Sequence, residues 1–135
     1  MTTDVRSDDG GFTPSDREAL LRNALAADGL RASSWSNVPG ERYAEHSHGY
    51  DKVLVVAAGS IGFTLSGSGR TTELAVADRL DLPAGTAHGA IVGADGVVCL
   101  EAHLPAGSLG DTAHHRAGWG RQALAPGETS APRLA

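Results

Sequence analysis

Two histidines separated by one residue are the part of this sequence best suited to chemistry. His46 and His48 lie in a strand-like stretch. In a β-strand, residues two positions apart point to the same face, so both imidazoles would converge on one place. Two neutral ring nitrogens held side by side provide the geometry of a metal chelate.

A third histidine makes this pattern more specific. His88 follows Pro83-Ala84-Gly85-Thr86-Ala87, which predicts a tight turn that delivers His88 to the start of a new strand. A His-x-His pair alone also occurs as surface or buried polar residues in β-proteins. Three histidines in this arrangement therefore favour a metal site more strongly than the pair does.

The elements that must position these histidines are short strands. Alternating patterns between glycine-rich turns predict strands over 30–35, 41–48, 51–58, 61–66, 71–76, 79–82, 87–92 and 97–104. Before them, Ser15 and Glu18 form a capping-box pattern, and apolar residues at helical spacing predict a helix over 15–28. This succession is typical of an antiparallel sandwich or barrel.

Length and composition limit the class of protein. The chain has 135 residues, 41% of them apolar, 18 glycines and a net charge of −5, which fits one small β-rich domain. It has no apolar run long enough to cross a membrane, no basic run for nucleic acid and a polar N-terminus unlike a secretory signal. The single cysteine, Cys99, predicts a reducing, cytoplasmic setting.

The histidines lie within two sequence motifs of fixed spacing. In the first, Gly40 is followed by five residues, His46-Ser47-His48, three residues, Lys52, six residues and Gly59. In the second, Ala77 is followed by five residues, Pro83-Ala84-Gly85, two residues, His88, three residues and Val92.

In this spacing, roughly residues 32–104 resemble the cupin superfamily. The chain departs from the family's motifs at three positions. Ala77 and Val92 replace a glycine and an asparagine, and Lys52 replaces the usual glutamate ligand.

The resemblance implies an all-β fold, a cupin jelly-roll barrel preceded by a short N-terminal helix. It implies that His46, His48 and His88 are metal ligands inside the barrel, in a three-histidine centre of a kind known among cupins. Imidazole suits a divalent Zn, Fe, Ni or Cu ion. We expect a disordered N-terminus over 1–13, one cupin domain over 14–110 and a loose C-terminal tail over 111–135.

Lys52 is the only lysine in the chain. An ammonium group beside a dication in a low-dielectric cavity is strongly unfavourable. Either Lys52 loses its proton, or it pairs with an acid, or no metal binds. Glu101, which shares one strand face with Cys99 and His103, could pair with Lys52 or act as an alternative ligand. If that face points outward, Glu101 is instead hydrated.

These residues predict an enzyme. Three protein ligands leave metal positions open for water or substrate, which is the catalytic pattern. Lys52 with a lowered pKa would act as general base, and Glu101 is the second catalytic candidate. A narrow pocket lined by Val, Leu and Ala would take a compact, partly apolar molecule, for oxygenase, isomerase, cyclase or lyase chemistry.

Two other functions stay open. The chain could be a non-catalytic cupin that binds or senses a small ligand, or a relic in which no metal binds. In each case we expect no nucleic-acid or membrane partner. The resemblance to other small cupins implies a homodimer.

Overall fold

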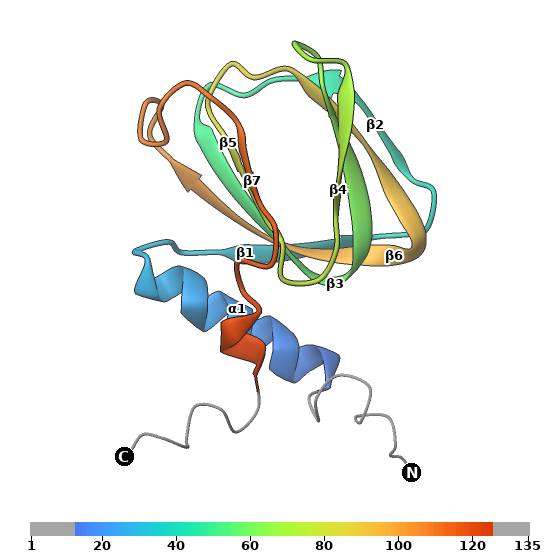
Figure 1. Ribbon diagram of the computed structural model, residues 1–135, viewed down its shortest axis with the longest axis vertical. Helices are drawn as coiled ribbons and strands as arrows, with labels where there is room; N and C mark the ends of the chain where they lie inside the picture. Colours follow the sequence, from blue (N-terminus) through green and yellow to red (C-terminus); the bar gives the residue numbers. More distant parts are fainter. Residues whose placement is uncertain (1–12, 126–135) are drawn as a thin grey trace.

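An antiparallel sheet of seven strands dominates the structure, a computed structural model that describes residues 13–125. Its elements are α1 (Pro14–Ala27), β1 (Ser33–Asn37), β2 (Arg42–His46), β3 (Asp51–Leu65), β4 (Arg70–Leu74), β5 (Arg79–Leu82), β6 (His88–Leu104), β7 (His114–Arg116) and the 3-10 helix η2 (Gln122–Leu124). The strands curve around an interior, and α1 lies along one side of them (Figure 1). The predicted all-β class with one N-terminal helix is confirmed.

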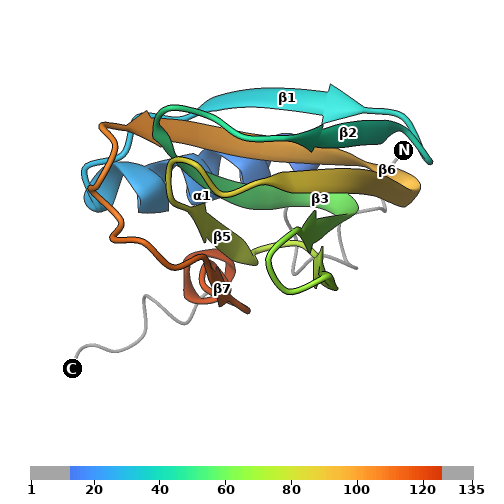
Figure 2. The same ribbon diagram turned by 90° about the horizontal axis from the view of Figure 1, so that it is seen from above.

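Two long strands organise the sheet. β3 and β6 pair with each other along most of their length, and the shorter strands flank them (Figure 2). We predicted two strands in place of each. The break expected at Gly59 is a bend instead, because Gly59 has a φ of +72° and the register shifts on both sides of it. Such bulges turn a strand without ending it.

Alternate residues of β3 belong to two different hydrophobic cores. Leu54 and Val56 face the interior of the barrel, whereas Val53 and Val55 face outward. The outward side packs against Leu21 and other apolar residues of α1. Burial on both faces explains why residues 51–57 are all buried.

The helix begins one residue before the predicted position and uses a different cap. Thr13 accepts a hydrogen bond from the Asp16 backbone, and the Asp16 side chain accepts one from the Thr13 backbone. Pro14 occupies the first helical position, where its fixed φ is favourable. The capping box is therefore Thr13 with Asp16, and not the predicted Ser15 with Glu18.

The described part of the predicted loose tail carries regular structure. β7 pairs with β5, and Arg116 of β7 forms an ion pair of 3.0 Å with the buried Asp81. The guanidinium of Arg79 lies 5.0 Å from the ring centroid of Trp119. These charged and aromatic contacts hold the segment on the barrel.

Both ends of the chain lie outside the described residues. The disorder predicted for 1–13 falls almost entirely there, as does the last part of the predicted tail, 126–135. Within residues 13–125, neither helix has the length and hydropathy to cross a bilayer.

Candidate metal centre and adjoining cavity

Three histidines meet at one end of the barrel interior. His46 ends β2, His88 begins β6, and the two are direct partners in the strand register. His48 lies in the connection between β2 and β3. One ligand atom from each ring lies within 4.8 Å of the others, which is close enough to hold one metal ion.

The strand predicted over 41–48 ends early, at His46. Residues 47–50 form the crossing from β2 to β3, so the strand alternation does not continue past His46. Tyr50 consequently does not line the cavity. Its ring instead lies between those of His48 and His103, at centroid distances of 5.0 and 4.2 Å.

Backbone contacts hold the loop of His48 against the turn before His88. The Gly85 N–H donates to the His48 carbonyl at 2.9 Å. The buried Asp51 carboxylate accepts a hydrogen bond from the Ala84 N–H at 2.8 Å and further bonds from Gly107 and Leu109. One acidic side chain thus fixes two loops, one of which leads into His88.

The ring nitrogens have the protonation pattern that metal ligands need. His46 Nδ1 lies 2.7 Å from the Ala44 carbonyl, and His88 Nδ1 lies 2.8 Å from that of Thr86. Because a carbonyl only accepts, each Nδ1 carries a proton, and in the neutral ring Nε2 then has the lone pair that can bind a metal. His48 Nε2 is buried and has no hydrogen-bond partner within residues 13–125. The three residues therefore fit a metal ion.

The local electrostatics keep two of these imidazoles neutral. Burial, together with nearby Lys52, His46 and His88, lowers the pKa of His48 to about 4. Burial also lowers the pKa of His88. At neutral pH both rings can bind a cation without first releasing a proton.

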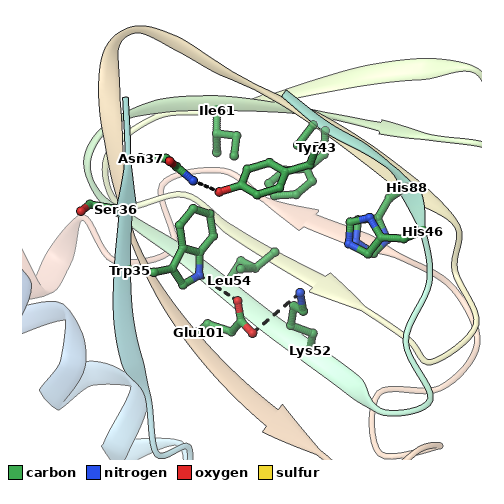
Figure 3. Close-up of a pocket in the computed structure, with 12 residues that line it drawn as sticks. Trp35, Ser36, Asn37, Tyr43, His46, Lys52, Leu54, Ile61, His88 and Glu101 are labelled. Carbon is green, nitrogen blue, oxygen red and sulfur yellow. Dashed lines mark hydrogen bonds and ion pairs between the residues drawn. The ribbon is translucent and has the colours of Figure 1, made fainter. Parts of the chain in front are cut away.

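Lys52 pairs with Glu101 across the interior. The Lys52 Nζ lies 3.7 Å from Glu101 Oε2 (Figure 3). The Glu101 carboxylate also accepts a hydrogen bond of 2.8 Å from Trp35 Nε1 and lies 2.6 Å from His103 Nε2. Burial raises the pKa of Glu101, but His103, Lys52 and Trp35 lower it on balance. Of the alternatives given for Lys52, the structure therefore has the one in which Lys52 pairs with an acid. Glu101 faces the interior and is not a hydrated surface residue.

Glu101 does not join the histidines as a ligand. Among the residues described, the cluster able to hold a metal consists of His46, His48 and His88. Cys99, two residues before Glu101 on β6, is buried, and burial raises the pKa of its thiol to about 12. It packs in the interior core as a small apolar residue.

A cavity of about 240 Å³ extends from the histidines into the barrel. Its lining residues are Trp35, Ser36, Asn37, Tyr43, His46, Lys52, Leu54, Ile61, Phe63, His88, Ala90 and Glu101. The prediction of a lining of Val, Leu and Ala is wrong in part, because three aromatic side chains line it and no valine does.

Sequence reasoning missed the wall opposite the histidines. The rings of Trp35 and Tyr43 meet edge to face at 5.9 Å, and Asn37 Nδ2 donates to the Tyr43 hydroxyl. The alternation of β1 could have indicated Trp35 and Asn37, which are two residues apart and share one strand face.

No protein-family model matches the chain, and no curated protein matches it. Among solved structures, a cupin superfamily protein from Desulfitobacterium hafniense is 22% identical with a TM-score of 0.50, over 56% of this chain and 67% of that chain. This likeness confirms the predicted fold.

Other solved structures are similar at lower TM-scores. KdgF from Halomonas sp. is 25% identical with a TM-score of 0.48, over 55% of this chain and 67% of that chain. An oxalate decarboxylase from Bacillus subtilis, which contains Mn(II) centres, is 19% identical with a TM-score of 0.49 over 55% of this chain. The match spans only 20% of the length of that decarboxylase.

Proposed function

Because the chain has the cupin fold, we propose that it is a metal-dependent enzyme acting on a small organic molecule, with His46, His48 and His88 as metal ligands. One observation carries the proposal. The buried His48 Nε2 lacks a hydrogen-bond partner within residues 13–125, and it lies in a cluster with two other imidazoles that line a cavity. A buried polar atom left without a partner is costly unless a ligand satisfies it.

The ion would be a divalent transition metal. Imidazole ligands suit Zn, Fe, Ni and Cu, and the manganese of the decarboxylase adds a fifth ion to test. When bound by three protein ligands, the ion would polarise a substrate oxygen or lower the pKa of a bound water.

Lys52 and Glu101 would handle charge and protons beside the ion. Lys52 lies in an ion pair with Glu101, and we assign it as a proton donor and as a cation that binds developing negative charge. The proton would pass from Nζ to a substrate oxygen and leave the neutral amine. Glu101 would position Lys52, with its own carboxylate held by Trp35 and His103.

A non-catalytic ligand-binding protein is the second candidate. One observation favours it: in the Lys52–Glu101 ion pair, the lysine that was expected to be the general base is already matched with an acid. Such a protein would bind the metal and the small molecule without turnover.

Metal analysis of the purified protein tests the proposal. After incubation with each candidate metal and removal of the excess, we expect one ion per chain by mass spectrometry. His46→Ala, His48→Ala and His88→Ala should each lose most of it. His114→Ala, which alters an exposed histidine on β7, is the matched control. Equal metal content in all four variants would contradict the proposal.

A second measurement separates the two candidates. A panel of small organic molecules is screened for turnover by the metal-loaded protein, and each active compound is repeated with Lys52→Met. The enzyme proposal expects lost turnover at unchanged metal content. Unchanged turnover would remove Lys52 from the mechanism, and saturable binding without product from any bound compound would favour the binding protein.

A further inference from the structure

The cavity combines a buried cation with an apolar, aromatic wall. From this combination we propose that its ligand is a small carboxylate. The charged end of the ligand would meet Lys52 beside the histidines, and its apolar body would lie against Trp35 and Tyr43. The inference rests on the proposed function, since it names the class of molecule that enters the same cavity.

The charges around the cavity favour an anion. Lys52 and Glu101 are the only charged groups among the lining residues of the described structure, and each offsets the other. The histidines supply no negative charge and the Lys52–Glu101 pair is neutral as a whole, so a divalent ion held by the histidines would give the cavity a net positive charge. In a partly buried site that imbalance attracts an anionic ligand strongly.

Lys52 has donor capacity left for such a ligand. Its side chain is 11% exposed, and the 3.7 Å between its Nζ and Glu101 Oε2 is longer than a hydrogen bond. Trp35 and His103 already occupy the Glu101 carboxylate. Within residues 13–125 the structure gives the ammonium group no hydrogen-bond acceptor besides this long contact, although it has three donors. Nζ points into the cavity (Figure 3).

The rest of the cavity suits an apolar body. Leu54, Ile61 and Phe63 line it together with the edge-to-face rings of Trp35 and Tyr43. Two polar groups on that wall, the Asn37 amide and the Tyr43 hydroxyl, bond to each other. A polyol or sugar would find few partners here, whereas an aromatic or cycloaliphatic ring would bury its surface.

The test is a nitrogen–proton NMR titration with three probes: benzoate, benzyl alcohol and acetate. Benzoate has both features, and each of the other probes lacks one. The indole N–H signal of Trp35 reports on the cavity and is assigned with Trp119→Phe. We expect saturable shifts with benzoate, and affinity for benzyl alcohol and acetate weaker by roughly 10- to 100-fold.

Two variants test whether Lys52 is responsible. In Lys52→Met the preference for benzoate over benzyl alcohol should disappear. The double variant Lys52→Met/Glu101→Gln should lose it too, and it avoids an unpaired buried carboxylate if the single variant folds poorly. Arg70→Met, on the exposed part of β4, should keep the wild-type preference. Equal affinities of the wild-type protein for benzoate and benzyl alcohol would overturn the inference. So would a preference for benzoate that survives in both Lys52 variants.

The titrations are run with zinc-loaded and metal-free protein, and the zinc content is measured in the same samples. If zinc binds and the protein does not prefer benzoate over benzyl alcohol, this inference is wrong while the proposed metal centre stands. If benzoate binds through Lys52 and zinc does not bind, the carboxylate site stands and the proposed metal-dependent enzyme is wrong.

Discussion

Lys52 on β3 and Glu101 on β6 are diagonal neighbours across the central strand pair, with Nζ and Oε2 3.7 Å apart. In the register, Lys52 lies opposite His103, and Leu54 lies opposite Glu101. Both side chains point to the interior face, where diagonal residues are within reach of long side chains. The pair thus places one positive and one negative charge beside the three histidines.

Removing the charge of Lys52 and removing the charge of Glu101 should change the metal affinity in opposite directions. Lys52→Met removes a cation near the site and should raise the affinity for zinc. Glu101→Gln removes an anion and should lower it. We expect a change of roughly tenfold in each case, because charges in a partly buried site are weakly screened. Competition with a chromophoric chelator measures both.

The exposed Arg70→Met serves as the control for a change in net charge alone. It should alter the zinc affinity little, because surface charges are screened by salt. Changes in the same direction for the Lys52 and Glu101 variants would contradict this electrostatic account.

The metal-free protein should lose stability as the pH falls from 7.5 to 5.5. The pKa of His48 is about 4 in the folded chain and 6.5 unfolded, so the unfolded state binds more protons in this window. The lowered pKa of His88 acts in the same direction. The part of the stability that comes from these lowered pKa values is fully present above pH 6.5 and is lost progressively toward pH 4. Urea unfolding at the two pH values measures it.

His48→Gln should reduce this pH dependence, because the residue no longer titrates. His114→Gln, on the exposed edge strand β7, should leave the dependence near that of the wild type. The window lies above the ordinary carboxyl range, so Asp51 and Glu101 contribute little to it. A wild-type protein that gains stability at pH 5.5 would refute the assignment.

Asp51→Asn should destabilise the fold and weaken the metal site together. The carboxylate accepts bonds from the backbone N–H groups of Ala84, Gly107 and Leu109, and an amide has only one oxygen for them. Although burial alone raises the pKa of Asp51, these backbone donors lower it on balance, so the charged form is the one bound. Thermal unfolding and zinc affinity are measured on the same samples.

Asp95→Asn is the matched control, because Asp95 is exposed. It should leave both the unfolding midpoint and the zinc affinity near the wild-type values. If Asp51→Asn unfolds earlier but binds zinc normally, the turn before His88 does not depend on Asp51.

Gly59→Ala should be strongly destabilising. Gly59 has a φ of +72°, and an added Cβ would lie 2.0 Å from the Gly96 carbonyl oxygen. We expect a loss of about 3 kcal/mol or more in the free energy of unfolding. Gly69 has a similar φ of +70° with open space around it, so Gly69→Ala should cost only about 1 kcal/mol. Denaturant unfolding measures both, and equal losses would mean that the close approach is unimportant.

The sequence predicted much of the fold, because alternation is a local property. The strands around His46, Lys52 and His88 lie close to their predicted positions. The joining of strands at Gly59 was missed, since a bulge and a turn have the same glycine-rich composition. The helix cap was missed because two overlapping capping patterns compete, and Pro14 at the first helical position agrees with Thr13.

The residue types and spacing by themselves determined which side chains are available and which residues of one strand share a face. They indicated three imidazoles, one lysine and an acid, and left the partner of Lys52 open. Only the tertiary structure decided that Glu101 faces inward to Lys52 and that Trp35 and Tyr43 close the cavity. Lys52 and Glu101 belong to strands far apart in sequence, and the register of those strands depends on bulges and packing that local periodicity does not encode.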